Sequence, residues 1–258
     1  WCGLRLGSST KLEEPEPCDL LEVCRNPSAC SIMSEKPPDS FVVSWHTSKG
    51  SFDLQVVTEW APPYATRMWQ LARLGYFTGA SFYRMLAKGE EAFVVQFGYN
   101  GKPEVDQCWD ARMTTNTTWS VHAPGNLRGY ASFSMDTVHQ TGANPNCSSE
   151  EYCAQGFSTN IFINLANNSR LDAPGFSIFG VVSPSGMRVV DSLYAGYGEC
   201  VELCGEGSSR PFCVGNGAAC QGVSLDLLLK EGDGYLDAMK PLLDHVKGTS
   251  LRTLTTVV

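Results

Sequence analysis

FYRMLAKGEEAFVVQFG, residues 82–98, predicts two strands, 80–86 and 92–98, joined by a polar turn. Both strands are rich in aromatic and aliphatic residues, and Arg84 and Gln96 are the polar exceptions. An arginine is almost never fully buried unless it is paired. Arg84 is therefore a solvated residue at the rim, one half of an ion pair, or a working group in a pocket.

The residues before this stretch predict a hairpin followed by a helix. Apolar residues alternate on both sides of a turn at Lys49-Gly50, which is typical of a β-hairpin over about 41–57. The next segment, APPYATRMWQLARLGYF (61–77), has two prolines suited to a first helical turn and a glycine suited to the stop. Its apolar residues recur at the spacing of one helix face.

The residues after it predict more short strands. We expect strands at 129–135, 160–165, 176–182 and 250–258, a short helix at 187–196, and an amphipathic segment at 230–246 interrupted by Pro241. Many short strands with two or three helices describe a closed barrel or a sandwich. Residues 1–38 form a cysteine-rich N-terminal extension, and 39–258 form the main domain, with insertions at about 136–157 and 200–221.

Charge and cysteines bound the class of protein. The net charge of −8 argues against nucleic acid and anionic membrane surfaces, which attract clustered Lys and Arg. No run of 18 apolar residues predicts a membrane span. Eleven cysteines without a CxxC pair favour disulfides over zinc, and the odd count leaves one cysteine free or bonded to another chain. We expect a bond between Cys147 and Cys153 that closes a small loop.

Three sequons point to the same compartment. Asn116, Asn146 and Asn167 each begin an N-x-S/T triplet, which marks a possible glycosylation site in a secreted protein. Each is weak alone, but together with the cysteines they predict a secreted, cell-surface or secretory-pathway lumenal protein. The chain begins at Trp1 rather than Met, which is typical of a processed or trimmed chain.

The usual covalent and metal motifs are missing from the sequence. There is no G-x-S-x-G, no H-E-x-x-H and no P-loop lysine, and the cysteines are expected to be paired. We therefore expect no cofactor and no metal. Arg84, Gln96 and a set of aromatic residues remain as the chemistry available.

The order of several segments resembles the cyclophilin family of peptidyl-prolyl cis-trans isomerases. SKGSFDLQVVTEWAP is similar to the family's first hairpin, YFTGASFYRM to its catalytic arginine segment, and AFVVQFG to its Phe-Met-x-Gln-Gly segment. STNIFINLANNSRLDAPGFSIFGVV and KEGDGYLDAMKPLLDHV resemble later family segments. The resemblance covers about 40–199 and 222–257 and leaves the cysteine-rich segments outside.

The resemblance implies a mainly β fold, a closed eight-stranded antiparallel β-barrel capped by two α-helices, with disulfide-rich loops. It implies that Arg84 is the catalytic residue, that Phe93, Phe162 and Val94 line a proline pocket, and that Gln96 binds the substrate backbone. Five positions depart from the family pattern. Val94 replaces Met, Asn160 replaces Gln, Met135 replaces Asn, and Phe176 replaces a pocket His. Arg170 stands where cyclosporin-sensitive members carry Trp.

The resemblance implies a prolyl isomerase acting on proline-containing substrates among secreted or cell-surface proteins. Such a reaction breaks no bond, so no nucleophile or metal is required. The alternative is a weakly active or inactive binding or structural subunit of an extracellular assembly, docked through its cysteine-rich segments. On the pattern alone, Arg84 is an ordinary ion-paired residue and Phe93 and Phe162 are core residues.

Overall fold

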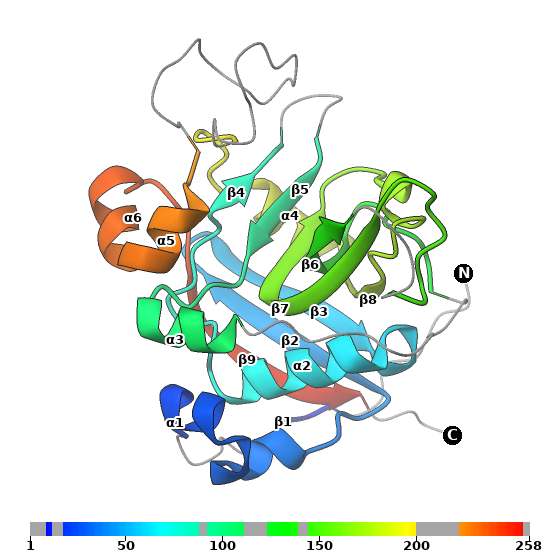
Figure 1. The fold of residues 1–258 in the computed structure, drawn as a ribbon, viewed down its shortest axis with the longest axis horizontal. Coiled ribbons are helices and arrows are strands. Elements are labelled where there is room, and N and C mark those ends of the chain that lie inside the picture. Colours follow the sequence, from blue (N-terminus) through cyan, green and yellow to red (C-terminus); the bar gives the residue numbers. More distant parts are fainter. Residues whose placement is uncertain are drawn as a thin grey trace.

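The fold is mainly β, and its strands form one antiparallel sheet (Figure 1). The computed structural model describes residues 9–11 (backbone), 18–87, 92–110, 123–138, 144–199 and 222–254. The strands are β1 (Ser9–Lys11), β2 (Ser40–Thr47), β3 (Gly50–Val57), β4 (Arg84–Met85), β5 (Val94–Phe97), β6 (Tyr130–Val138), β7 (Cys153–Asn164), β8 (Ile178–Val182) and β9 (Val246–Leu254). They pair in the order β1-β9-β2-β3-β8-β6-β7-β5-β4.

The sheet is an open, curled half-barrel, so the expectation of a closed barrel is wrong. In the described sheet, β1 lies at one edge and β4 at the other, and β4 pairs only with β5. The strand expected at 80–86 is reduced to Arg84–Met85. The residues before it bond to another segment: Phe82 N–H donates to the Asp244 carbonyl, and Val246 N–H donates to the Ala80 carbonyl, each at 2.9 Å. One isolated bridge, Ser81 to His245, spans the gap near the start of β9.

The predicted hairpin and helix at the start of the main domain are confirmed. β2 and β3 pair residue by residue from Ser40–Val57 to Thr47–Gly50, and Gly50 turns the chain at a φ of 126°. The helix α2 (Pro62–Arg73) follows, with proline in its first turn. The last strand begins at Val246, earlier than the sequence suggested.

In the described part of the chain, five further α-helices lie around the sheet. They are α1 (Leu20–Arg25), α3 (Pro103–Trp109), α4 (Pro184–Asp191), α5 (Leu225–Glu231) and α6 (Asp233–Met239). Among the described helices, α2 packs against β8 and β9, and α4 packs against β3. Among the described residues, no helix is long and apolar enough to cross a membrane.

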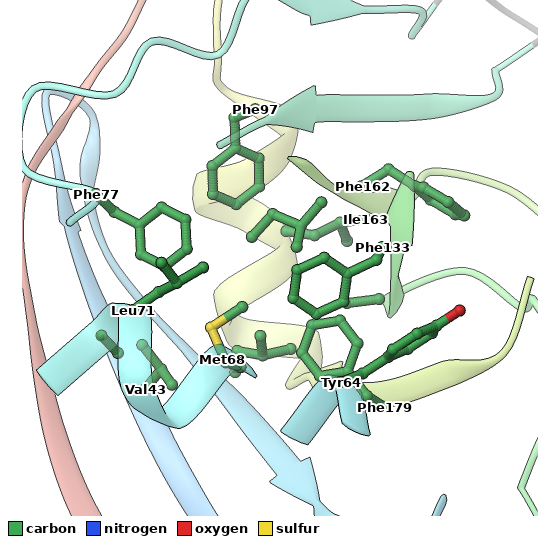
Figure 2. Packing of buried hydrophobic residues seen from close by; sticks show 14 of the residues in the cluster. Val43, Tyr64, Met68, Leu71, Phe77, Phe97, Phe133, Phe162, Ile163 and Phe179 are labelled. Atoms are coloured by element: carbon green, nitrogen blue, oxygen red, sulfur yellow. The ribbon is translucent and has the colours of Figure 1, made fainter. Parts of the chain in front are cut away.

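An aromatic core fills the space between α2 and the sheet. Figure 2 shows side chains of α2, including Tyr64, facing Phe133 and Phe179 of the sheet. The ring of Tyr64 contacts those of Phe133 and Phe157 at centroid distances of 5.1 and 4.6 Å. Edge-to-face contacts of this kind add specificity to apolar burial. The core thus fixes α2 on one face of the sheet and leaves the other face to the strands' alternate residues.

The N-terminal extension is fastened to the main domain. Cys18–Cys30 closes the extension on itself, and Cys24–Cys108 joins α1 to α3. The sequence left open a stapled unit or a clamp, and the structure contains both. We call the contact of residues 18–35 with α2 and α3 the seam. It borders an open cavity of about 180 Å³, lined by Val23, Cys24, Pro27, Met33, Arg67, Cys108 and Trp109.

The two insertions differ in what can be described. In the first, β6 runs to Val138 and β7 begins at Cys153, so both strands reach into the insertion. Cys147 forms a disulfide with Cys153, the pairing expected from the sequence. The second insertion, 200–221, lies outside the described residues.

Candidate functional site

Three neighbouring strands place Arg84, Gln96 and Phe162 in one row. Arg84 of β4 lies opposite Gln96 of β5, and Gln96 lies opposite Phe162 of β7. Directly opposed residues of antiparallel strands share a face. Val95 and Phe97, which alternate with Gln96, are fully buried in the core. The row therefore lies on the outer face of the half-barrel, as the resemblance implied.

The guanidinium of Arg84 is held by a carboxylate that sequence reasoning did not identify. Nε donates to both carboxylate oxygens of Glu199 at 2.9 Å, and Nη2 donates to Oε2 at 2.5 Å. Nη1 donates to Oε1 of Gln96 at 3.1 Å. Arg84 is thus one half of an ion pair, one of the three possibilities that the sequence left open.

A second restraint acts through Gln96. Its Nε2 donates to Oγ of Ser134 at 2.9 Å, while its Oε1 accepts from Arg84. Because the amide has one donating and one accepting end, the two contacts together fix which way it faces. A chain of four side chains, from Ser134 through Gln96 and Arg84 to Glu199, results.

The ion pair is poorly exposed. The side chain of Glu199 is 7% exposed and that of Arg84 is 23% exposed. Removing one partner of a buried pair costs about 3–5 kcal/mol, because a charge is left uncompensated. A hydrogen bond from a charged donor to a neutral acceptor returns only about 1.5–3 kcal/mol. A neutral acceptor is therefore too weak to displace Glu199 from Arg84.

Phe93 lies against this guanidinium. The Arg84 Cζ is 5.8 Å from the centre of the Phe93 ring, and Cζ of Arg170 is 4.5 Å from it. Both distances are within the range of cation–π attraction. Phe93 precedes β5, where its backbone bonds to Leu86 and Leu165 at 2.7 and 2.9 Å. Its ring is half-buried at the edge of the row.

The apolar residues expected in the pocket are nearly covered. Phe162 and Phe176 meet at a centroid distance of 6.1 Å in an edge-to-face contact and are 5% and 8% exposed. Val94 is 2% exposed. Figure 2 places Ile163 among the core side chains and Phe162 at the outer side of the cluster. The structure thus brings Phe162 and Phe176 together, with Val94 on the strand that carries Gln96.

Two expected site residues are engaged elsewhere. Met135 accepts a hydrogen bond from Oη of Tyr64 at 3.0 Å, inside the core. Ordinary strand alternation with Phe133 directs its side chain inward, while Ser134 between them lies on the outer face. Asn160 accepts from Oη of Tyr83 at 3.1 Å and is 4% exposed. Neither contacts Arg84 through a described hydrogen bond.

The two site residues that the sequence reasoning missed differ in how they could have been found. Ser134 alternates with the core residues of β6, so the strand pattern places it on the outer face. Glu199 is 115 residues from Arg84 and belongs to no strand or helix, so no local pattern points to it.

The remaining predicted sites are easily located. Asn146 is half-buried, with Nδ2 3.3 Å from Oδ1 of Asn144, and Asn167 is exposed. Asn116 lies outside the described residues. Within the described ranges, no group of three or more His, Cys, Asp or Glu side chains could hold a metal ion.

The comparisons with known proteins assign the fold to a family. The model described as cyclophilin type peptidyl-prolyl cis-trans isomerase/CLD matches residues 42–202. This chain belongs to that family. The match includes Arg84, Gln96 and Glu199, whereas the resemblance noted for 222–257 lies outside it. No curated protein matches the chain.

Solved cyclophilins are distant in sequence. A Cryptosporidium parvum cyclophilin type peptidyl-prolyl cis-trans isomerase is 13% identical, with 84% of this chain and 99% of that chain covered and a TM-score of 0.45. Its structure in the presence of the dipeptide ala-pro is 14% identical, with 82% of this chain and 99% of that chain covered and a TM-score of 0.45. Cyclophilin AquaCyp293 from Hirschia baltica is 15% identical, with 61% of this chain and 71% of that chain covered and a TM-score of 0.39. These likenesses say nothing about this chain's substrate.

Proposed function

We propose that this chain is a peptidyl-prolyl cis-trans isomerase that acts on X-Pro bonds by non-covalent stabilisation of the twisted amide. The observation that carries the proposal is Arg84, whose guanidinium lies beside Phe93 and is fixed against Gln96 on the outer face of a cyclophilin-type sheet. Membership of the family supports the reaction class.

The chemistry asks for little more than this arrangement. An X-Pro bond isomerises over tens to hundreds of seconds because its partial double bond must be lost. Reaching milliseconds takes about 10⁴-fold, or about 5.5 kcal/mol. A charge-assisted hydrogen bond from Arg84 to the twisted, pyramidal prolyl nitrogen supplies about 1.5–3 kcal/mol. Positioning and exclusion of water by the apolar residues must supply the rest.

The substrate would meet Arg84 and Phe93 together. In this proposal the prolyl ring lies against Phe93 and Phe162, and Gln96 contacts the peptide backbone. Phe93 is half-buried, so part of its ring is open to a ligand. Val94, Phe162 and Phe176 form the buried wall behind it.

We further propose that the clients are secreted or cell-surface proteins. The disulfides Cys18–Cys30, Cys24–Cys108 and Cys147–Cys153 support an oxidising compartment. Glycosylation at Asn146 and Asn167, and at Asn116, belongs to the same proposal. Peptide mapping of protein purified from its native source would test the disulfides and the glycosylation.

A second function, a prolyl-peptide binding module with little or no turnover, is favoured by one observation. The carboxylate of Glu199 already occupies Nε and Nη2 of Arg84, so the guanidinium enters any complex with its charge balanced. In that case the cysteine-rich segments would dock the module into an extracellular assembly.

An isomerase assay on a prolyl peptide separates these functions. The set is wild type, Arg84→Ala and the double variant Arg84→Ala with Glu199→Gln, because the single variant leaves Glu199 buried without its counter-charge. We expect both variants to lose about 10- to 100-fold in kcat/KM, the equivalent of one charge-assisted hydrogen bond. Equal activity in all three rejects the mechanism. Peptide binding without turnover in the wild type favours the binding module.

A further inference from the structure

We propose that Glu199 is a positioning residue that holds the guanidinium of Arg84 in its working orientation throughout the reaction. This inference rests on the proposed function and adds to it a residue from a remote segment. Glu199 is joined to Arg84 by three donor–acceptor contacts between 2.5 and 2.9 Å, whereas Gln96 makes one. The carboxylate is therefore the main determinant of where the guanidinium lies.

The contacts leave a defined set of donors for substrate. A guanidinium has five N–H groups. Nε–H is shared by both oxygens of Glu199, one Nη2 hydrogen is directed to Oε2, and one Nη1 hydrogen is directed to Gln96. One N–H remains on each terminal nitrogen. Arg84 can therefore donate to a substrate without releasing Glu199.

The segment that carries Glu199 is itself anchored. Tyr194 N–H donates to Oδ2 of Asp244 at 2.7 Å, and the Tyr194 and Tyr197 rings lie 5.0 Å apart. The backbone oxygen of Glu199 accepts from Gly222 N–H at 3.2 Å. These contacts hold the backbone before Glu199 and at Glu199 itself. Glu199 thus meets Arg84 from a set position rather than from a free side chain on an exposed loop.

The charge of Glu199 has a second consequence for Arg84. A free guanidinium on a flexible side chain samples many rotamers, and holding it in one orientation removes an entropic cost from the reaction itself. Glu199 weakens Arg84 as a hydrogen-bond donor only to a limited extent, because the two unused N–H groups remain charge-assisted donors. Positioning therefore outweighs neutralisation, and removal of the carboxylate should slow the reaction.

The kinetic test uses Glu199→Gln, which keeps the shape and removes the charge. We expect kcat for a prolyl peptide to fall about tenfold, with KM within twofold of wild type, because the loss is in orientation. The matched control is Glu35→Gln, which removes the carboxylate of another ion pair, Glu35–Arg73 at 3.1 Å, at the seam. It should leave kcat unchanged. Glu199→Gln turnover at or above the wild-type rate would overturn the inference, since the carboxylate would then be a brake or a bystander.

A second measurement does not depend on turnover. In the wild type, the Arg84 Nε proton should exchange slowly with solvent by nitrogen-edited NMR, and Glu199→Gln should speed that exchange at least tenfold, with Glu35→Gln unchanged. Fast exchange in the wild type overturns the inference even if the enzyme is active. Slow exchange in a protein without isomerase activity removes the proposed function but keeps Glu199 as the group that orients Arg84.

Discussion

Arg67 and Arg84 are two arginines in apolar surroundings that are held by different kinds of partner. Arg67, 7% exposed at the seam, donates to the carbonyls of Ser158 and Trp109 at 3.1 and 3.3 Å and lies 4.7 Å from the Trp109 ring. All these partners are neutral, and burial lowers its pKa to about 10. Arg84 is more exposed, its charge is balanced by Glu199, and it keeps unused N–H groups. Arg67 therefore joins structural elements, whereas Arg84 is equipped to meet a ligand.

The largest expected effect concerns the seam and its disulfide. Cys24 and Cys108 are 84 residues apart, and a cross-link over that separation stabilises by about 4.5 kcal/mol on a chain-entropy estimate. Replacing both by Ala should lower the free energy of unfolding by that amount in urea denaturation, with kcat unchanged in the folded protein. The comparison fails if turnover falls together with stability.

The matched control for that experiment is the short loop. Cys147 and Cys153 are six residues apart, so removing their bond should cost about 2 kcal/mol by the same estimate. An equal loss from both double variants would mean that the length of the closed loop does not govern the stabilisation.

The next effect lies between the two regions, at Asp106 of α3. This carboxyl is 1% exposed and accepts from Tyr76 Oη and from the N–H groups of Asn100 and Gly101, at 2.9, 2.6 and 2.9 Å. Asn100 and Gly101 follow β5, the strand of Gln96, while α3 carries Cys108 and Trp109 of the seam. Desolvation raises the pKa of Asp106 from 3.8 to about 6, against the opposing effect of its hydrogen bonds.

The sign follows from which state loses its proton first. As pH rises, the unfolded chain ionises at the ordinary pKa while the folded Asp106 still holds its proton, so the folded state is penalised. Stability from this group is present below pH 4 and is lost by about pH 6, in total about 3 kcal/mol. The difference in unfolding free energy between wild type and Asp106→Asn should shift by that amount across this range. Asp226→Asn, on the surface of α5, is the control, and an equal pH dependence in both variants contradicts the assignment.

The sequence supported more of the fold than of the site's contacts. Local alternation and helix-stop signals predict the β2–β3 hairpin and α2, because these depend on neighbouring residues. Barrel closure depends on how 80–86 pair, and only Arg84–Met85 forms a strand, while Ser81 makes an isolated bridge to His245. The closed barrel was therefore an error that no local pattern would have prevented.

The site divides in the same way. The row of Arg84, Gln96 and Phe162 follows from family order and strand register. Met135 was misplaced because the family order was followed rather than the alternation of β6, which puts Met135 on the same inward face as Phe133. Glu199 is brought to Arg84 only by the folded chain across 115 residues. Arg67, in the sequence TRMWQLAR, and Arg84, in FYRML, look alike until their partners are known.

The smallest expected effect tests the two arginines directly. Arg67→Met keeps most of the side-chain volume beside the cavity but leaves the carbonyls of Ser158 and Trp109 without their donor, which should cost about 2 kcal/mol of unfolding free energy. Its kcat should match wild type, because the contacts of Arg67 are structural. The double variant Arg84→Ala with Glu199→Gln should give the reverse pattern, with turnover lost and stability nearly kept, since both members of the pair are neutralised together. If Arg67→Met slows catalysis as much as it destabilises the fold, then the seam and the outer face are coupled. In that case the exposure of an arginine side chain and the charge of its partner would not distinguish a structural arginine from one that binds a ligand.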